Sequence, residues 1–122
     1  MSTQPSTGTP ARFLVRGAER DTVLGDLVSA LVALGDDASR ATQTSRDVRL
    51  HVISCHAEHL AGEVRDLMTD SAFDGPFVEA GGLVASATAA REALEKTAEG
   101  PLPESIAASV RWLIDLTEAV TT

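Results

Sequence analysis

The sequence predicts an all-α protein, an antiparallel four-helix bundle that follows a short disordered arm. Apolar residues recur every three or four positions in four stretches of the 122-residue chain, which is the period of an amphipathic helix. Segments with Gly, Pro or Asp separate these stretches, and such residues end helices. The two-residue alternation of a strand does not compete with this pattern. Short connections favour antiparallel neighbours, with up-down-up-down order as the default.

The arm is assigned to residues 1–9, which are small, polar and contain proline, and one bundle domain is assigned to residues 10–122. Thr9 and Pro10 resemble an N-cap followed by proline at the first helical position. The first helix is predicted to run from about Pro10 to the residue before Gly35, which stands at a C-cap position. Its repeat consists of Phe13, Gly17, Arg20, Leu24, Leu27, Leu31 and Leu34.

The second helix is expected after Asp36 and Asp37, which can cap it. Residues 38–47 are polar all round and form either a protruding helix or a loop. The apolar stripe that follows consists of Leu50, Ile53, Ala57, Leu60, Val64 and Leu67.

The third helix is predicted to open at Asp74 and Pro76 and to end at Gly100. Its stripe consists of Phe77, Ala80, Val84, Ala87 and Leu94. The fourth helix starts near Pro103, and its stripe consists of Leu102, Ile106, Val110, Leu113 and Val120.

The third helix also carries a face of small residues: Gly82, Ala85, Ser86, Ala89, Ala90 and Ala93. Gly81 and Gly82 inside a helix would cost about 1 kcal/mol each relative to alanine, a cost that close helix packing can offset. Small residues of the second helix (Ala57, Ala61 and Gly62) favour packing within the chain. A homodimer contact and a ligand cavity are the alternatives.

Composition limits the possible partners and compartments. Aromatic residues make up only 3% of the chain, so the core must be aliphatic. A single cysteine cannot form an internal disulfide, and we find no signal peptide or membrane span, so a cytoplasmic protein is expected. Arginine outnumbers lysine nine to one, which indicates a GC-rich bacterial genome.

The formal charge of −8 lies wholly in residues 58–122, because six acids and six arginines cancel over residues 1–57. This distribution argues against direct nucleic-acid binding, which relies on cations that neutralise phosphates. The acidic half could instead mimic nucleic acid, and this is the third functional hypothesis.

The fourth helix has a wider apolar face than one core needs. Trp112, Leu116, Ala108 and Ala119 extend the stripe sideways. Trp112 would either anchor a partner, since tryptophan is enriched in interface hot spots, or plug one end of the core. The predicted partner-binding residues are Trp112, Leu116, Ile106, Ala108 and Ala119.

All three histidines and the cysteine fall within nine residues of the second helix: His51, Cys55, His56 and His59, followed by Glu63. Residues three or four apart on a helix can bind one metal ion, and imidazole with thiolate suits zinc. The same residues could form a pH-sensitive contact or a redox-reactive thiol. Catalytic motifs such as HExxH, CxxC and phosphate loops are absent from the sequence, so neither an enzyme nor a cofactor is predicted.

The leading hypothesis is therefore a small protein-interaction module, an adaptor or regulator that forms a homodimer through the fourth helix. The alternative is a metal-, redox- or pH-responsive sensor that uses the histidine–cysteine cluster.

Overall fold

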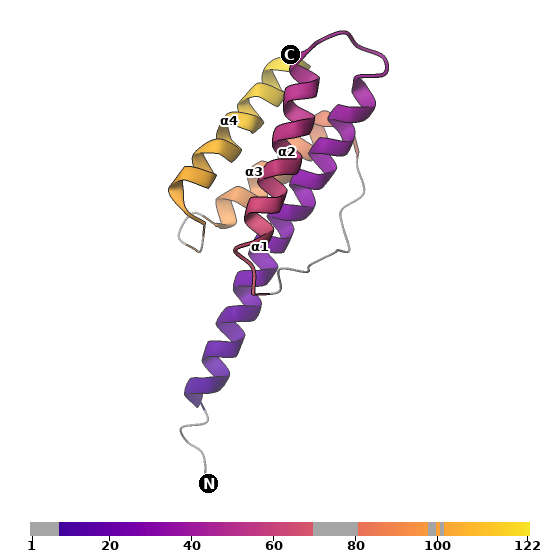
Figure 1. Ribbon diagram of the computed structural model, residues 1–122. Coiled ribbons are helices and arrows are strands. Elements are labelled where there is room, and N and C mark those ends of the chain that lie inside the picture. Colours follow the sequence, from indigo (N-terminus) through magenta and orange to yellow (C-terminus); the bar gives the residue numbers. More distant parts are fainter. Residues whose placement is uncertain (1–7, 70–80, 98–99, 101) are drawn as a thin grey trace.

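The computed structural model describes residues 8–69, 81–97, 100 and 102–122, with side chains described from residue 21 onward. These residues form four α-helices and no strand (Figure 1). The helices are α1 (Gly8–Ala41), α2 (Arg49–Arg65), α3 (Leu83–Lys96) and α4 (Glu104–Thr121). The predicted all-α fold with four helices is confirmed. Of the predicted arm, residues 1–7 lie outside the described residues, whereas Gly8 and Thr9 already belong to α1.

The first helix continues through Gly35, so the predicted end before this glycine is wrong. A Cβ atom on Gly35 would lie 3.5 Å from the Cβ of Ala57 and 3.5 Å from the carbonyl oxygen of Ser54. Gly35 therefore lies within α1 and faces α2, with room for a methyl group, rather than at a helix end. Asp36 and Asp37, predicted to cap the second helix, also lie inside α1, which reaches Ala41 before a turn leads to α2.

The buried carboxylate of Asp37 links the end of α1 to the start of α3. Its Oδ2 accepts a hydrogen bond from the backbone N–H of Gly82 over 3.1 Å, and Arg40 Nη1 lies 3.7 Å from Oδ1. Gly82 has φ 105°, which favours glycine, and it stands immediately before α3. The prediction that Gly81 and Gly82 lie inside the third helix is therefore wrong. The predicted start at Asp74 and Pro76, with Phe77 and Ala80, lies outside the described residues.

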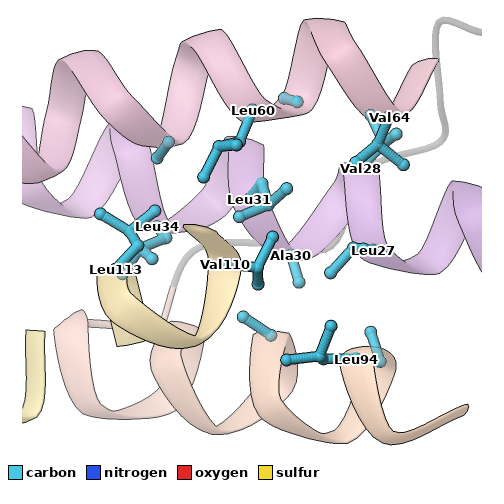
Figure 2. Close-up of a cluster of buried hydrophobic side chains, with 14 of the residues drawn as sticks. Leu27, Val28, Ala30, Leu31, Leu34, Leu60, Val64, Leu94, Val110 and Leu113 are labelled. Atoms are coloured by element: carbon cyan, nitrogen blue, oxygen red, sulfur yellow. The ribbon is translucent and has the colours of Figure 1, made fainter. Parts of the chain in front are cut away.

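The core is a single cluster of aliphatic side chains to which all four helices contribute (Figure 2). Leucines of α1 such as Leu31 and Leu34 meet Leu60 and Val64 of α2 on one side. Leu94 of α3 and Leu113 of α4 close the other side. The described core holds no aromatic side chain, as the composition predicts. The stripes of α2 and α4 are accordingly buried or partly buried: Leu50, Ile53, Ala57, Leu60, Val64, Leu67, Leu102, Ile106, Val110, Leu113 and Val120.

Each helix packs against two others, and the order differs from the up-down-up-down default. α1 contacts α2 and α3, and α4 contacts α2 and α3. Within the described residues, no Cα atom of α2 lies within 8 Å of α3, nor any of α1 within 8 Å of α4. α2 and α3 thus lie diagonally opposite each other in the bundle. The backbone N–H of Thr69, after α2, donates to Asp21 near one end of the bundle, and the backbone N–H of Gly82, before α3, donates to Asp37 near the other end.

Helix directions follow from the same contacts. The ends of α1 and α3 meet in opposite order, with Asp37 against Gly82 and Asp26 Oδ2 4.0 Å from Lys96 Nζ. α1 and α2 also run in opposite directions, and so do α3 and α4 (Figure 1).

The small-residue face of α3 packs within the chain, but its partner is not the predicted one. Ser86, Ala90 and Ala93 are buried, whereas Ala85 and Gly82 are exposed. Since α3 does not approach α2, Ala57 and Ala61 cannot be its counterpart. Ala57 packs against Gly35 of α1 instead.

The N-terminal part of α1 extends past the ends of the other three helices (Figure 1). None of the helices in the described part of the chain has the length and apolar character that a membrane crossing requires.

Candidate functional site

One side of α4 is buried in the core, and the side that carries Trp112 lies at the surface beside α2. Val110, Leu113 and Ile114 are fully buried in the core. The buried hydroxyl of Thr117 donates a hydrogen bond to the carbonyl oxygen of Leu113 over 2.8 Å, so this polar group carries no unmet bond into the core. These contacts fix the rotation of α4 about its axis and thereby the position of Trp112.

Trp112 lies on the surface, against α2. Half of the residue's surface remains exposed (50%), and its ring meets the imidazole of His56 edge to face, with ring centroids 5.2 Å apart and planes at 61°. Such aromatic pairs are stabilised by about 0.5–1.5 kcal/mol beyond the area they bury. Because the indole lies outside the core, the alternative that Trp112 plugs one end of the core is wrong.

The other predicted partner-binding residues divide into two groups. Ile106 and Leu116 are partly buried and pack against the core. Ala108 and Ala119 are exposed on the same helix. All five thus lie on α4, at different depths.

Two residues of α2 join this surface, and sequence reasoning missed both of them in this role. Val52 is 40% exposed, and His56 follows it by one helical turn and contacts Trp112. Val48, one turn earlier, is 72% exposed. The available signal was an apolar row at four-residue spacing outside the main stripe. We call the surface formed by Trp112, Ala108, Leu116 and Ala119 of α4 with Val52 and His56 of α2 the Trp112 face.

Charged side chains border the Trp112 face along α4. Arg111 donates a hydrogen bond to Glu104, and Arg91 of α3 bonds both Glu118 (2.9 Å) and Asp115 (3.4 Å). The hydrogen bond to Glu118 is the main reason that the pKa of Arg91 is raised. Exposed ion pairs like these add little stability because water screens them, so they can exchange partners readily.

The histidine–cysteine cluster lies on the exposed side of α2. His51, Cys55, His56 and His59 are all exposed, and Cys55 is a free thiol. His59 Nε2 lies 3.3 Å from Glu63 Oε1, whereas His56 lies against Trp112. The described residues bring no three His, Cys, Asp or Glu side chains together as metal ligands. The metal- or redox-sensor hypothesis therefore stays a prediction.

The structure therefore offers one apolar, aromatic surface and one exposed row of imidazole and thiol groups, both on or beside α2. Comparison of the chain with protein-family models, with curated proteins and with solved structures finds no match.

Proposed function

We propose that this chain is a small cytoplasmic protein-interaction module, an adaptor or regulator, that pairs with a second copy through the Trp112 face. The observation that supports the proposal is the half-exposed indole of Trp112, which stands on a bundle whose described core is aliphatic. Tryptophan is enriched among the residues that dominate binding energy at interfaces.

Covering this indole would contribute substantially to the free energy of association. A buried tryptophan removes roughly 200 Å² from water, so covering the remaining half would bury about 100 Å². At about 25 cal/mol per Å², that area contributes roughly 2–3 kcal/mol to association. The surrounding Ala108 and Ala119 are small, which lets a partner helix approach α4 closely.

The charges beside Trp112 favour a second copy as the partner. Arg111 and Asp115 lie one turn apart on α4 and are both exposed. In an antiparallel pair of α4 helices whose two-fold axis crosses the exposed side of α4 at the level of residue 113, Arg111 of each copy would lie beside Asp115 of the other. A self-complementary patch of this kind is what a two-fold dimer requires.

The proposal is tested by sedimentation equilibrium of the wild type, Trp112→Ala and Val84→Ala over a wide range of protein concentration. Val84 is the control because it is 65% exposed and lies on α3, away from α2. We expect a reversible wild-type dimer that Trp112→Ala weakens at least tenfold, about 1.4 kcal/mol, while Val84→Ala leaves it unchanged. A wild type that stays monomeric, or a dimer indifferent to Trp112, would overturn the proposal.

A second candidate function, a pH-responsive contact, is favoured by the packing of His56 on Trp112. A protonated imidazole at this position would place a positive charge inside the Trp112 face. Dimer dissociation constants are compared at pH 5.5 and pH 7.5 in the wild type and in His56→Gln. The candidate requires a pH dependence that His56→Gln removes, and a wild-type affinity independent of pH would rule it out.

A further inference from the structure

A row of side chains that can bind metals runs along the exposed side of α2. Cys55, His59 and Glu63 follow one another at four-residue spacing, so each lies only about 40° around the helix from the one before. Cys55 and His59 are exposed, and Glu63 is partly exposed. Because side chains one turn apart lie side by side, Cys55 and His59 can reach the same metal ion.

The imidazole of His59 is already oriented by a carboxylate. Its Nε2 atom lies 3.3 Å from Oε1 of Glu63, one turn later in α2. A proton on Nε2 in this contact leaves Nδ1 as the nitrogen with a free lone pair. Histidines that bind metals commonly donate their other ring N–H to a carboxylate, which fixes the tautomer and the ring orientation. Glu63 therefore has the position of an outer partner, and His59 that of a direct ligand.

The second ligand of the pair is the thiol of Cys55, which is free and exposed. Thiolate together with imidazole is the donor set of zinc and of similar transition-metal cations. Such a cation binds the thiolate, and the thiol proton passes to the solvent. A closed zinc site has four ligands in tetrahedral geometry. The described residues bring no three His, Cys, Asp or Glu side chains together, so the pair is half of such a site.

We propose that two copies of the chain bind one divalent cation of the zinc type between their α2 helices, with Cys55 and His59 of each copy as the ligands. A two-fold axis through the ion applies the same pair twice and so completes a Cys₂His₂ set. Both side chains lie on the exposed side of α2, where a second helix can approach. Glu63 is a positioning residue, since it holds His59 rather than the ion.

The test is native mass spectrometry and calorimetric titration of the full chain with Zn²⁺ and with Co²⁺, in a buffer whose phosphine reductant excludes disulfides. The protein carries Trp112→Ala so that the dimer proposed above does not contribute. We expect one metal ion per two chains and a change from monomer to dimer when the metal is added. With Co²⁺ we also expect the near-ultraviolet absorption that a thiolate ligand gives to this ion.

The ligands are assigned by single substitutions in the same background. Cys55→Ser and His59→Ala should each weaken zinc binding at least tenfold, and Cys55→Ser should also remove the cobalt–thiolate absorption. Glu63→Gln should weaken zinc binding by about ten- to a hundredfold while this absorption stays, as expected of a positioning residue. His51→Ala is the matched control, because His51 is also an exposed histidine one turn from Cys55, and it should have no effect.

Several results would overturn the inference. These are no uptake of either metal, one ion per chain without dimerisation, or binding that Cys55→Ser leaves unchanged. Binding that is lost with His51→Ala but kept with His59→Ala would do the same, since it would assign the site to another pair. Cys55 and His59 do not belong to the Trp112 face. A metal-free wild type that stays monomeric therefore contradicts the proposed function alone, and absence of metal binding contradicts this inference alone.

Discussion

The two sides of α2 meet their neighbours in different ways. Toward α1, Gly35 faces Ala57, and the apolar side chains are buried under a charged rim. Toward α4, the buried stripe is topped by Trp112, His56 and Val52, which stay exposed. The α1–α2 contact has the features of a folding contact, whereas the α2–α4 contact leaves unburied the kind of surface that interfaces use.

The largest difference should appear when the same substitution is made on both sides. Val64 is fully buried beside Val28 of α1, whereas Val52, one turn before His56, is 40% exposed. Val64→Ala should lower the free energy of unfolding by about 2 kcal/mol, because it removes buried methyl groups and leaves a cavity. Val52→Ala should lower it by less than about 0.5 kcal/mol. Urea denaturation measures both changes in the free energy of unfolding. Equal losses would contradict the claim that the two sides of α2 differ in packing.

At Gly35 we expect a smaller change in the free energy of unfolding, and its sign depends on the side chain that is introduced. A Cβ there would be in ordinary van der Waals contact with Ala57, so alanine fits, whereas a longer side chain does not. Gly35→Ala should raise the free energy of unfolding by about 0.5–1 kcal/mol through helix propensity. Gly35→Leu should lower it by about 1–3 kcal/mol by forcing α1 and α2 apart. Stabilisation by leucine would show that the two helices are not closely packed.

The smallest effect is expected at the charged turn before α2. Asp47 accepts hydrogen bonds from the side chain and the backbone N–H of Arg49, and the side-chain bond is the main reason that the pKa of Asp47 is lowered. Because its folded pKa lies below the unfolded value, Asp47 stabilises the fold above the unfolded pKa. This contribution is lost as the pH falls through the folded pKa.

Urea midpoints of the wild type and Asp47→Ala should therefore differ slightly at pH 7 and converge at acidic pH below the pKa of Asp47. A difference that persists there would mean that the charge of Asp47 is not what stabilises the turn.

Helix existence was predictable because the apolar stripes of α2 and α4 are long and regular. The end of α1 was not, because Gly35 followed by Asp36 has the composition of a helix end, whereas the helix continues through both residues to Ala41. Whether a helix continues past a glycine depends on the residues that pack against it, and the local sequence does not contain that information.

One part of the candidate site could be predicted from the sequence, and the other part could not. Trp112 stood out as the single tryptophan on the wide face of α4. Val52 and His56 did not, because their role depends on α2 lying beside α4 rather than beside α3. Hydrophobic periodicity tells which side of a helix is buried, but it does not determine which helices are neighbours.

The most direct test of the account is the fluorescence emission of Trp112, the only tryptophan in the chain, measured from nanomolar to high micromolar protein. If the Trp112 face is a docking surface for a second copy, the emission maximum should shift to shorter wavelength as the concentration rises, along a binding curve that matches sedimentation. An emission maximum that stays at the long wavelength of an exposed indole over the whole range would contradict it.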